Sequence, residues 1–307
     1  MRCGVQKPDV TLIVATYNRE RLLLDTVQDL LRLTGVREGA AEILVVDQST
    51  SHQDATSQQL LHWDQSGVIR WMRTAPPGLT RARNIGLAAS QGDWVIFVDD
   101  DVRIENAGFI GAHVAALQKV GVGAAVGRIL VPGQPPLTVS RDIGNLGYFG
   151  WREPGFGSDW NGPTATLRGC NMSFKKAALN EVGGFDERYT RSAFREDTDI
   201  SYRLRRHGYA LWFSADAWLY HLGAPEGGTR DQSIAVDFDL ILNDIRFAMR
   251  NLAGFSKLAW LARIYGSRVI KAGLLRGQGT QRHHAFVRGM LDIARELPWN
   301  PTRGRIS

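Results

Sequence analysis

Short apolar runs alternate with segments of helical periodicity over the first hundred residues of the chain. The runs are continuous enough for strands that are covered on both faces. They lie at residues 10–15, 43–46, 68–72 and 94–98. The segments between them, at residues 19–33, 53–63 and 80–89, carry apolar residues at helical spacing. This alternation predicts an α/β fold with a mixed, mostly parallel sheet flanked by helices on both faces.

The pattern changes after residue 101. Residues 107–118 and 197–207 predict helices, and residues 124–131 and the apolar run at 209–213 predict strands. Residues 132–163 are rich in glycine, proline and aromatic residues, which predicts a long loop of the kind that often lines a substrate site. From residue 241 to 297 the apolar spacing is helical again, with many arginines and lysines.

These changes divide the chain into a large domain at 1–236 and a basic helical region at 237–307. The large domain has two halves, at about 1–101 and 102–236. Helices with interleaved basic and apolar residues can lie on an anionic membrane surface, or can pack as a cap on the neighbouring domain. Both interpretations are open for the C-terminal basic residues, which are Arg246, Arg250, Lys257, Arg263, Arg268 and Lys271.

Composition narrows the class of protein only in part. With 307 residues and 44% hydrophobic content, the chain can bury a sizeable core. A net charge of +6 suits anionic partners but selects none, and no nucleic-acid-binding motif is present. Two cysteines, Cys3 and Cys170, make no disulfide framework, and the first eight residues lack a signal peptide's apolar core. No run of about 18 apolar residues predicts a spanning helix, so a cytoplasmic setting is expected.

Three consecutive carboxylates end the fourth apolar run. Asp99, Asp100 and Asp101 follow residues 94–98 directly, at the carboxyl end of a predicted buried strand, where open α/β sheets bind ligands. Because like charges repel, a hard divalent cation with its preference for oxygen ligands is the favoured interpretation, over a solvated acidic turn. Asp99 and Asp101 would point the same way from an extended chain.

Polar residues also follow the first two strands. Thr16, Tyr17, Asn18 and Arg19 lie at a strand-to-helix turn, which suits a nucleotide held by backbone N–H groups, or an ordinary helix cap by Asn18. Asp47 can accept hydrogen bonds from a base or ribose, or can form a turn. The first strand is followed by no G-x-G-x-x-G, and the chain contains no P-loop, which argues against two common nucleotide folds.

Further candidates come from helix starts. Arg83 and Asn84 lie near the start of the helix at 80–89, where cations are unfavourable unless an anion compensates; surface arginines are the alternative. Gly86 would allow close packing. Glu196 and Asp197 begin a helix, where the dipole stabilises carboxylates, and where a rigid general base could also stand.

One short segment and one histidine are further candidates. Residues 169–174 suit a pocket wall, since they are small and polar and then apolar. A lone histidine such as His221 is more often a packing residue than a ligand.

Taken in order, these motifs resemble the inverting family 2 glycosyltransferases with the GT-A fold. The resemblance covers roughly residues 10–222. No single motif is specific, but the ordered set is. It comprises Ala-Thr-Tyr-Asn-Arg, Asp47, Ala-Arg-Asn-x-Gly, Asp-Asp-Asp, Gly-Cys-Asn-Met, Gly-Gly-Phe-Asp-Glu, Glu-Asp and a late histidine.

The resemblance implies roles for individual residues. Asp99 and Asp101 match the family's DxD motif, which holds Mg²⁺ or Mn²⁺ on the donor diphosphate, and His221 matches a third metal-side position. Asp197 matches the catalytic base, with Glu196 beside it. The implied donor-binding residues are Thr16, Tyr17, Asn18, Arg19, Asp47, Arg83, Asn84, Asp99 and Asp100. The halves at about 1–101 and 102–236 would then bind donor and acceptor respectively.

The implied activity is transfer of a sugar from a nucleotide sugar, by default a UDP-sugar, to a hydroxyl of a saccharide or lipid-linked saccharide. Polysaccharide or glycolipid synthesis would place the enzyme in the cytoplasm, peripherally on the inner face of the membrane. A sugar nucleotidyltransferase is an alternative, but its usual Gly-rich phosphate loop is missing at residues 16–19. A non-catalytic nucleotide- or glycan-binding homologue is another.

Overall fold

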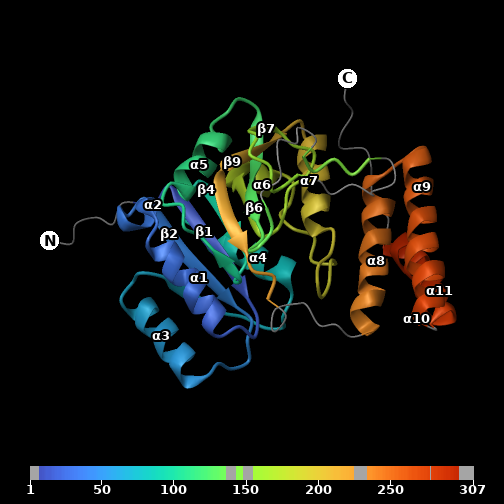
Figure 1. Ribbon diagram of the computed structural model, residues 1–307, viewed down its shortest axis with the longest axis horizontal. Helices are drawn as coiled ribbons and strands as arrows, with labels where there is room; N and C mark the ends of the chain where they lie inside the picture. The colour runs from blue at the N-terminus through green and yellow to red at the C-terminus, as the bar shows by residue number, and fades with distance from the viewer. Residues whose placement is uncertain (1–6, 136–142, 148–154, 225–233, 277, 297–307) are drawn as a thin grey trace.

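A single mixed sheet runs through the large domain of the computed structural model (Figure 1), which describes residues 7–135, 143–147, 155–224, 234–276 and 278–296. The strand order is β3-β2-β1-β4-β8-β6-β9-β5, and β7 pairs with β9. The strands are β1 (Val10–Thr16), β2 (Ala41–Asp47), β3 (Arg70–Arg73), β4 (Trp94–Val98), β5 (Val102–Arg103), β6 (Val122–Leu130), β7 (Gly162–Pro163), β8 (Asn171–Lys175) and β9 (Ala210–His221).

The helices follow the order expected from the sequence. Those of the large domain are α1 (Arg21–Leu31), α2 (Thr34–Arg37), α3 (Asp54–Gln65), α4 (Leu79–Ala89), α5 (Phe109–Leu117), α6 (Lys176–Glu181) and α7 (Glu196–Arg206). The C-terminal region contains α8 (Ile234–Asn251), α9 (Gly254–Ile264), the π-helical η1 (Tyr265–Lys271), α10 (Ala272–Arg276) and α11 (Gly279–Glu296).

Strands β1 to β4 are parallel to one another, and β8 reverses direction between β4 and β6. The register pairs Thr16 with Asp47 and Val14 with Val98. The carboxyl ends of β1, β2 and β4 therefore meet at one edge of the sheet. This edge is where the polar residues following these strands emerge, as the order of the motifs predicted.

Both faces of the sheet are buried, because successive side chains of a strand point to opposite sides. In β4, Val95 and Phe97 join one core with residues of α4, α6 and α7. Ile96 and Val98 join a second core with residues of α1, α3 and α5. Gly86 of α4 allows close packing, since a Cβ there would lie 2.6 Å from Ile13 Cγ2. The predicted α/β fold, a sheet with helices on both faces, is confirmed.

Element boundaries differ from the sequence prediction in two instructive places. Helix α1 begins at Arg21 after Glu20, so Asn18 is not its cap; Asn18 lies outside the helix with a left-handed φ of 51°. The apolar run at 209–213 is only the start of β9, which continues to His221. Because the polar residues Ser214 and Asp216 interrupt the apolar run, the sequence did not indicate that one long strand carries His221 at its end.

The C-terminal helices pack beside α7 (Figure 1). Tyr202 of α7 contacts Phe247 of α8 edge to face, with ring centroids 5.1 Å apart. Several of the C-terminal basic residues pair with carboxylates: Arg263 and Arg268 with the buried Asp244, and Arg250 with Asp186. No helix of the described ranges is long and apolar enough to cross a membrane.

Candidate active site

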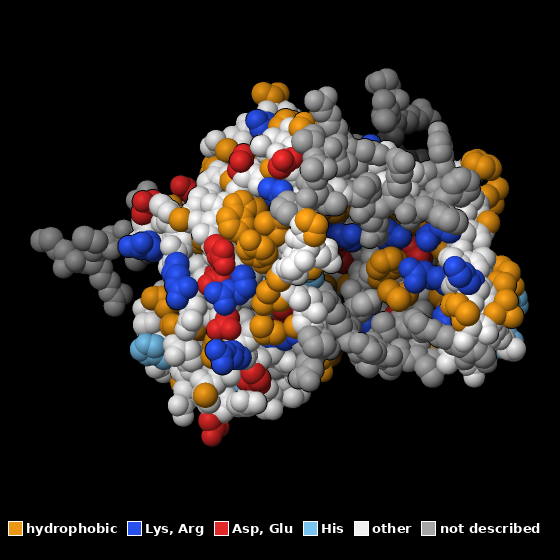
Figure 2. Space-filling view, viewed as in Figure 1, with side chains coloured by type: hydrophobic (Ala, Val, Ile, Leu, Met, Phe, Trp, Pro, Cys, Tyr) orange, Lys and Arg blue, Asp and Glu red, His pale blue; other side chains and the backbone are white. Residues whose placement is uncertain are grey.

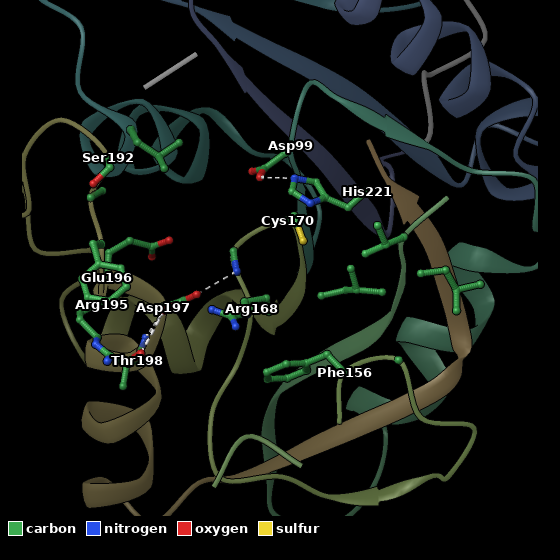
Figure 3. Close-up of a pocket in the computed structure, with 18 of the residues that line it drawn as sticks. Asp99, Phe156, Arg168, Cys170, Ser192, Arg195, Glu196, Asp197, Thr198 and His221 are labelled. Atoms are coloured by element: carbon green, nitrogen blue, oxygen red, sulfur yellow. Dashed lines mark hydrogen bonds and ion pairs between the residues drawn. The ribbon is translucent and has the colours of Figure 1, made fainter. Parts of the chain in front are cut away.

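A cavity of about 580 Å³ opens at the carboxyl edge of the sheet (Figure 3). Its walls come from segments that are far apart in the sequence. Arg83 lies on α4, Asp99 follows β4, and residues 168–170 precede β8. The start of α7, with Glu196 and Asp197, and the end of β9, with His221, complete the wall. The cavity therefore gathers most of the ordered sequence motifs around one volume.

The three consecutive aspartates have different surroundings. Asp99 faces the cavity with 30% of its side chain exposed. Asp100 is buried, accepts a 2.7 Å hydrogen bond from Thr16 Oγ1 and lies 3.3 Å from Arg19 Nε. Burial raises the pKa of Asp100 to about 7, although Thr16 and Arg19 oppose the shift. Asp100 thus ties the loop after β4 to the end of β1, through its contacts with Thr16 and Arg19.

Asp101 is also buried but is charged. Burial alone would raise the pKa of Asp101. Hydrogen bonds from His221 and from the Ala224 N–H, the latter 2.9 Å long, instead hold this pKa at about 2. His221 Nε2 lies 3.3 Å from Asp101 Oδ1 and 3.9 Å from Asp99 Oδ2. The structure therefore brings the predicted trio of Asp99, Asp101 and His221 together.

This donor set suits a divalent cation. Two carboxylates supply the oxygen ligands that Mg²⁺ and Mn²⁺ prefer, and the His221 imidazole adds a nitrogen ligand. Among the described residues, potential ligand atoms of Asp99, Cys170 and His221 also lie within 4.8 Å of one another. The sequence predicted Cys170 as part of a pocket wall, and Cys170 does line the cavity. The sequence did not indicate that this cysteine lies close to Asp99 and His221.

Arg83 links the aspartates to the start of α7. Its guanidinium donates to Glu196 Oε1, to the Gly169 carbonyl at 3.1 Å, and lies 3.4 Å from Asp99 Oδ1. Burial alone would lower the pKa of Arg83, but Glu196 and Asp99 outweigh it and raise the pKa. A Cβ at Gly169 would lie 2.8 Å from both Arg83 Nη2 and Glu196 Oε1, so a larger residue there would have to displace these two side-chain ends.

Glu196 and Asp197, although adjacent, are placed differently. Glu196 is buried against Arg83, and its Oε2 has no hydrogen-bond partner among the described residues. Burial raises the pKa of Glu196 to about 7, opposed by Arg83. Asp197 is half-buried: Oδ1 accepts from Thr198 and Oδ2 accepts a 3.3 Å bond from the Gly169 N–H (Figure 3). Asp197 is thus the more accessible carboxylate.

The loop before α7 was missed by sequence reasoning. Ser192, Ala193, Phe194 and Arg195 line the cavity, and Ala193 and Arg195 have left-handed φ values of 49° and 76°. Nothing in their residue types signals this backbone, because glycine normally marks it.

Seven of the nine predicted donor residues do not line the cavity, and Asp47 is one of them. The Asp47 side chain is fully buried and accepts hydrogen bonds from the Ser49 N–H, His52 Nε2 and Trp71 Nε1, at 2.8, 2.8 and 3.0 Å. Its carboxylate therefore orders the turn after β2, which was the open alternative.

Asn84 is directed to a neighbouring turn. Its amide binds the backbone of Phe185 through both its nitrogen, at 2.9 Å, and its oxygen, at 2.8 Å. Asn84 lines no part of the cavity that Arg83 lines. Of the turn after β1, Tyr17 is half-buried and Asn18 is exposed.

The architecture is that of GT-A glycosyltransferases. The chain resembles GalNAc-T7 bound to UDP, GalNAc and Mn²⁺, with a TM-score of 0.68 and 17% identity, covering 95% of this chain and 57% of that one. It also resembles Mannosyltransferase PcManGT from Pyrobaculum calidifontis, in complex with GDP-Man and Mn²⁺, with a TM-score of 0.55, 17% identity and coverage of 96% and 88%. A third similar structure is S. aureus TarS in complex with UDP-GlcNAc. Its TM-score is 0.64 at 16% identity, and the match covers 94% of this chain and 82% of that one.

The chain belongs to glycosyl transferase family 2, whose sequence model matches residues 11–183. Validoxylamine A glucosyltransferase of Streptomyces hygroscopicus subsp. limoneus is 27% identical over an alignment of 286 residues that covers 85% of this chain and 61% of that protein. O-antigen biosynthesis protein RfbC of Myxococcus xanthus is 23% identical over an alignment of 224 residues that covers 70% of this chain and 17% of RfbC. The chain thus spans about three fifths of the first relative and a smaller part of the second.

Proposed function

We propose that the protein is a metal-dependent, inverting glycosyltransferase that uses a nucleotide sugar, with a UDP-sugar favoured. The observation that carries this proposal is the cavity, in which the accessible carboxylate of Asp197 shares one volume with Asp99, His221 and Arg83. A base, a cationic side chain and a metal-capable cluster are the groups that sugar transfer to a hydroxyl requires. The family to which the chain belongs supports the same reaction class.

Asp99, Asp101 and His221 are the residues that would hold Mg²⁺ or Mn²⁺. When bound, such an ion would neutralise charge on the departing nucleoside diphosphate. Arg83 adds a fixed positive charge beside Asp99. GalNAc-T7 and PcManGT, which share the fold, are complexed with Mn²⁺, which supports this assignment without choosing between the two metals.

Asp197 is the proposed general base. Its Oδ2 has one 3.3 Å bond from the Gly169 N–H, which orients the carboxylate and leaves it able to accept a proton from an acceptor hydroxyl. The deprotonated oxygen then attacks the anomeric carbon opposite the leaving group, so configuration inverts. Glu196 is the less suitable base, because it is buried and paired with Arg83.

The donor can be identified without knowledge of the acceptor. Because ligands stabilise the state that they bind, the true nucleotide sugar should raise the melting temperature, and more so with Mn²⁺. A panel of UDP-, GDP- and dTDP-sugars, with and without Mn²⁺, makes this test. No shift with any of them would contradict the proposal.

Two rival functions predict different products. A sugar nucleotidyltransferase would release pyrophosphate from a nucleoside triphosphate and a sugar phosphate. A non-catalytic homologue would bind a donor but neither hydrolyse nor transfer it. Product analysis by mass spectrometry separates all three, and the proposal requires release of the nucleoside diphosphate with transfer of the sugar.

We also propose a saccharide or lipid-linked saccharide acceptor, as in polysaccharide or glycolipid synthesis, and a location on the cytoplasmic membrane face. Support comes from large apolar side chains on the C-terminal helices. Phe255, Leu258, Leu274 and Leu275 are 70%, 67%, 80% and 77% exposed. Figure 2 shows orange side chains along the outer edge of this helical region. A stable soluble surface seldom exposes so many large apolar groups together.

Liposome flotation tests the membrane location. The double variant Leu274→Ser and Leu275→Ser should float less than wild type with anionic vesicles, since burial of each leucine contributes about 1.5–3 kcal/mol. Val120→Ser is the control, because Val120 is an apolar side chain even more exposed than these leucines but lies in the large domain. Equal flotation of all three proteins would refute the membrane proposal.

A further inference from the structure

Cys170 has no part in the proposed transfer reaction, yet its side chain lines the cavity. The residue is only 6% exposed, directly before β8, and its thiol is free. A thiol binds a metal ion as the thiolate, so an ion bound here would take the place of the Cys170 proton.

Two further ligands lie beside this sulfur. Ligand atoms of Asp99, Cys170 and His221 all lie within 4.8 Å of one another, and they come from three separate segments of the chain. Tetrahedral zinc bonds of about 2.0–2.3 Å place neighbouring ligands about 3.5 Å apart. If side-chain rotation shortened the distances between these ligand atoms by about 1 Å, the three residues could coordinate one ion.

The ligand types select the ion. A thiolate, an imidazole and a carboxylate together are typical of zinc, whereas magnesium prefers oxygen alone. The cavity beside the three residues provides room for water as a fourth ligand. We infer that Asp99, Cys170 and His221 form a binding site for a thiophilic divalent cation, with Zn²⁺ as the natural ligand class.

Charge and proton balance are satisfied. As the metal–sulfur bond forms, the Cys170 proton passes to water, and the ion loses water molecules to the three side chains. Thiolate and carboxylate then neutralise the two positive charges of the ion. The Arg83 guanidinium keeps its second carboxylate partner, Glu196, when Asp99 turns to the ion.

The site has a consequence for the enzyme that rests on the proposed function. Asp99 and His221 are shared with the proposed Mg²⁺ or Mn²⁺ site, so the two ions cannot be held at once. Zn²⁺ at Cys170 would therefore exclude the ion that the donor diphosphate needs, and would act as an inhibitor competing with Mn²⁺. Binding of the thiophilic ion itself requires neither donor nor acceptor.

Cd²⁺ is the probe for this site, because a cadmium–thiolate bond absorbs in the ultraviolet. The full chain is titrated with Cd²⁺ alone, so the result is independent of transferase activity. The chain has only two cysteines, which makes each the control for the other. The Cys3→Ser variant should keep the absorption band, and Cys170→Ser should lose it, with unchanged circular dichroism in both.

A second variant tests the other ligands. In the Cys3→Ser background, His221→Ala should weaken Cd²⁺ binding about tenfold or more. Zn²⁺ should displace Cd²⁺ at equal concentration, whereas the same concentration of Mg²⁺ should not. A band that persists in Cys170→Ser, a band lost in Cys3→Ser, or an affinity unchanged by His221→Ala would each overturn the inference.

Discussion

Asp244 of α8 links the C-terminal helices to the cavity through Arg195, which lines the cavity. The carboxylate is fully buried and contacts three arginines: Arg195 Nε at 2.9 Å, Arg263 Nη2 at 3.2 Å and Arg268 Nε at 2.9 Å. Burial alone would raise the pKa of Asp244, but these three cations outweigh it and lower the pKa. Arg195 directly precedes Glu196, so the link extends to the start of α7.

We predict that Asp244→Asn strongly destabilises the protein. The amide nearly preserves the volume but removes the negative charge that balances the buried Arg195 and the half-buried Arg263 and Arg268. Removing one partner of a buried ion pair costs about 3–5 kcal/mol. This is a large share of the roughly 5–15 kcal/mol by which a domain is stable. At about 2–4 °C per kcal/mol, the melting temperature should fall by about 6–20 °C.

Asp292→Asn is the matched control. Asp292 also lies in the C-terminal helices, on α11, and also contacts two arginines, Arg288 at 3.5 Å and Arg295 at 3.6 Å. Its side chain is 51% exposed, and exposed pairs contribute about 0–1 kcal/mol. Urea unfolding of both variants should therefore show a large loss only for Asp244→Asn. Equal losses would refute the assignment of Asp244 as a buried charge centre.

Two further predictions concern pH and have opposite signs. Burial lowers the pKa of His113 to about 4. The neutral imidazole therefore contributes its whole share of the free energy of unfolding above the unfolded pKa of about 6.5. That share falls by about 3 kcal/mol as the pH drops to about 4. Urea unfolding of wild type and His113→Gln at several pH values should show their difference shrinking on acidification; a constant difference would contradict this. The raised pKa of Glu196, about 7, has the reverse effect, because stability from the neutral carboxyl is present below pH about 4.5 and is lost as pH rises through about 7. The advantage of wild type over Glu196→Gln in the same assay should therefore decrease between these pH values, and an increase would argue against a buried, proton-binding Glu196.

The fold and the gathering of the site were predictable because they depend on local patterns. A run such as 94–98, apolar on both faces and ending in acids, indicates a covered strand whose carboxyl end carries ligands. Parallel strands then bring Thr16, Asp99 and the acids after them to one edge. This reasoning needs only the order of the elements.

The partner of each charged residue was not predictable, because partners come from distant segments. The sequence shows arginines at 263 and 268 but not that Asp244 lies buried between them. Likewise, the carboxylate of Asp47 is occupied by His52 and Trp71, which only the folded chain brings near it. Residue type limits what a side chain can do, but tertiary packing decides which partner it meets.

The central claim is that Asp197 removes the proton from the acceptor, and Asp197→Asn tests it most directly. The amide keeps the shape of the side chain but cannot accept a proton, so transfer should fall by about 10²–10⁴-fold. Binding of the nucleotide sugar in the presence of Mn²⁺, measured by calorimetry, should stay nearly unchanged, because Asp99, Arg83 and His221 are intact. Parallel loss of binding and transfer, or transfer at the wild-type rate, would contradict the assigned role of Asp197.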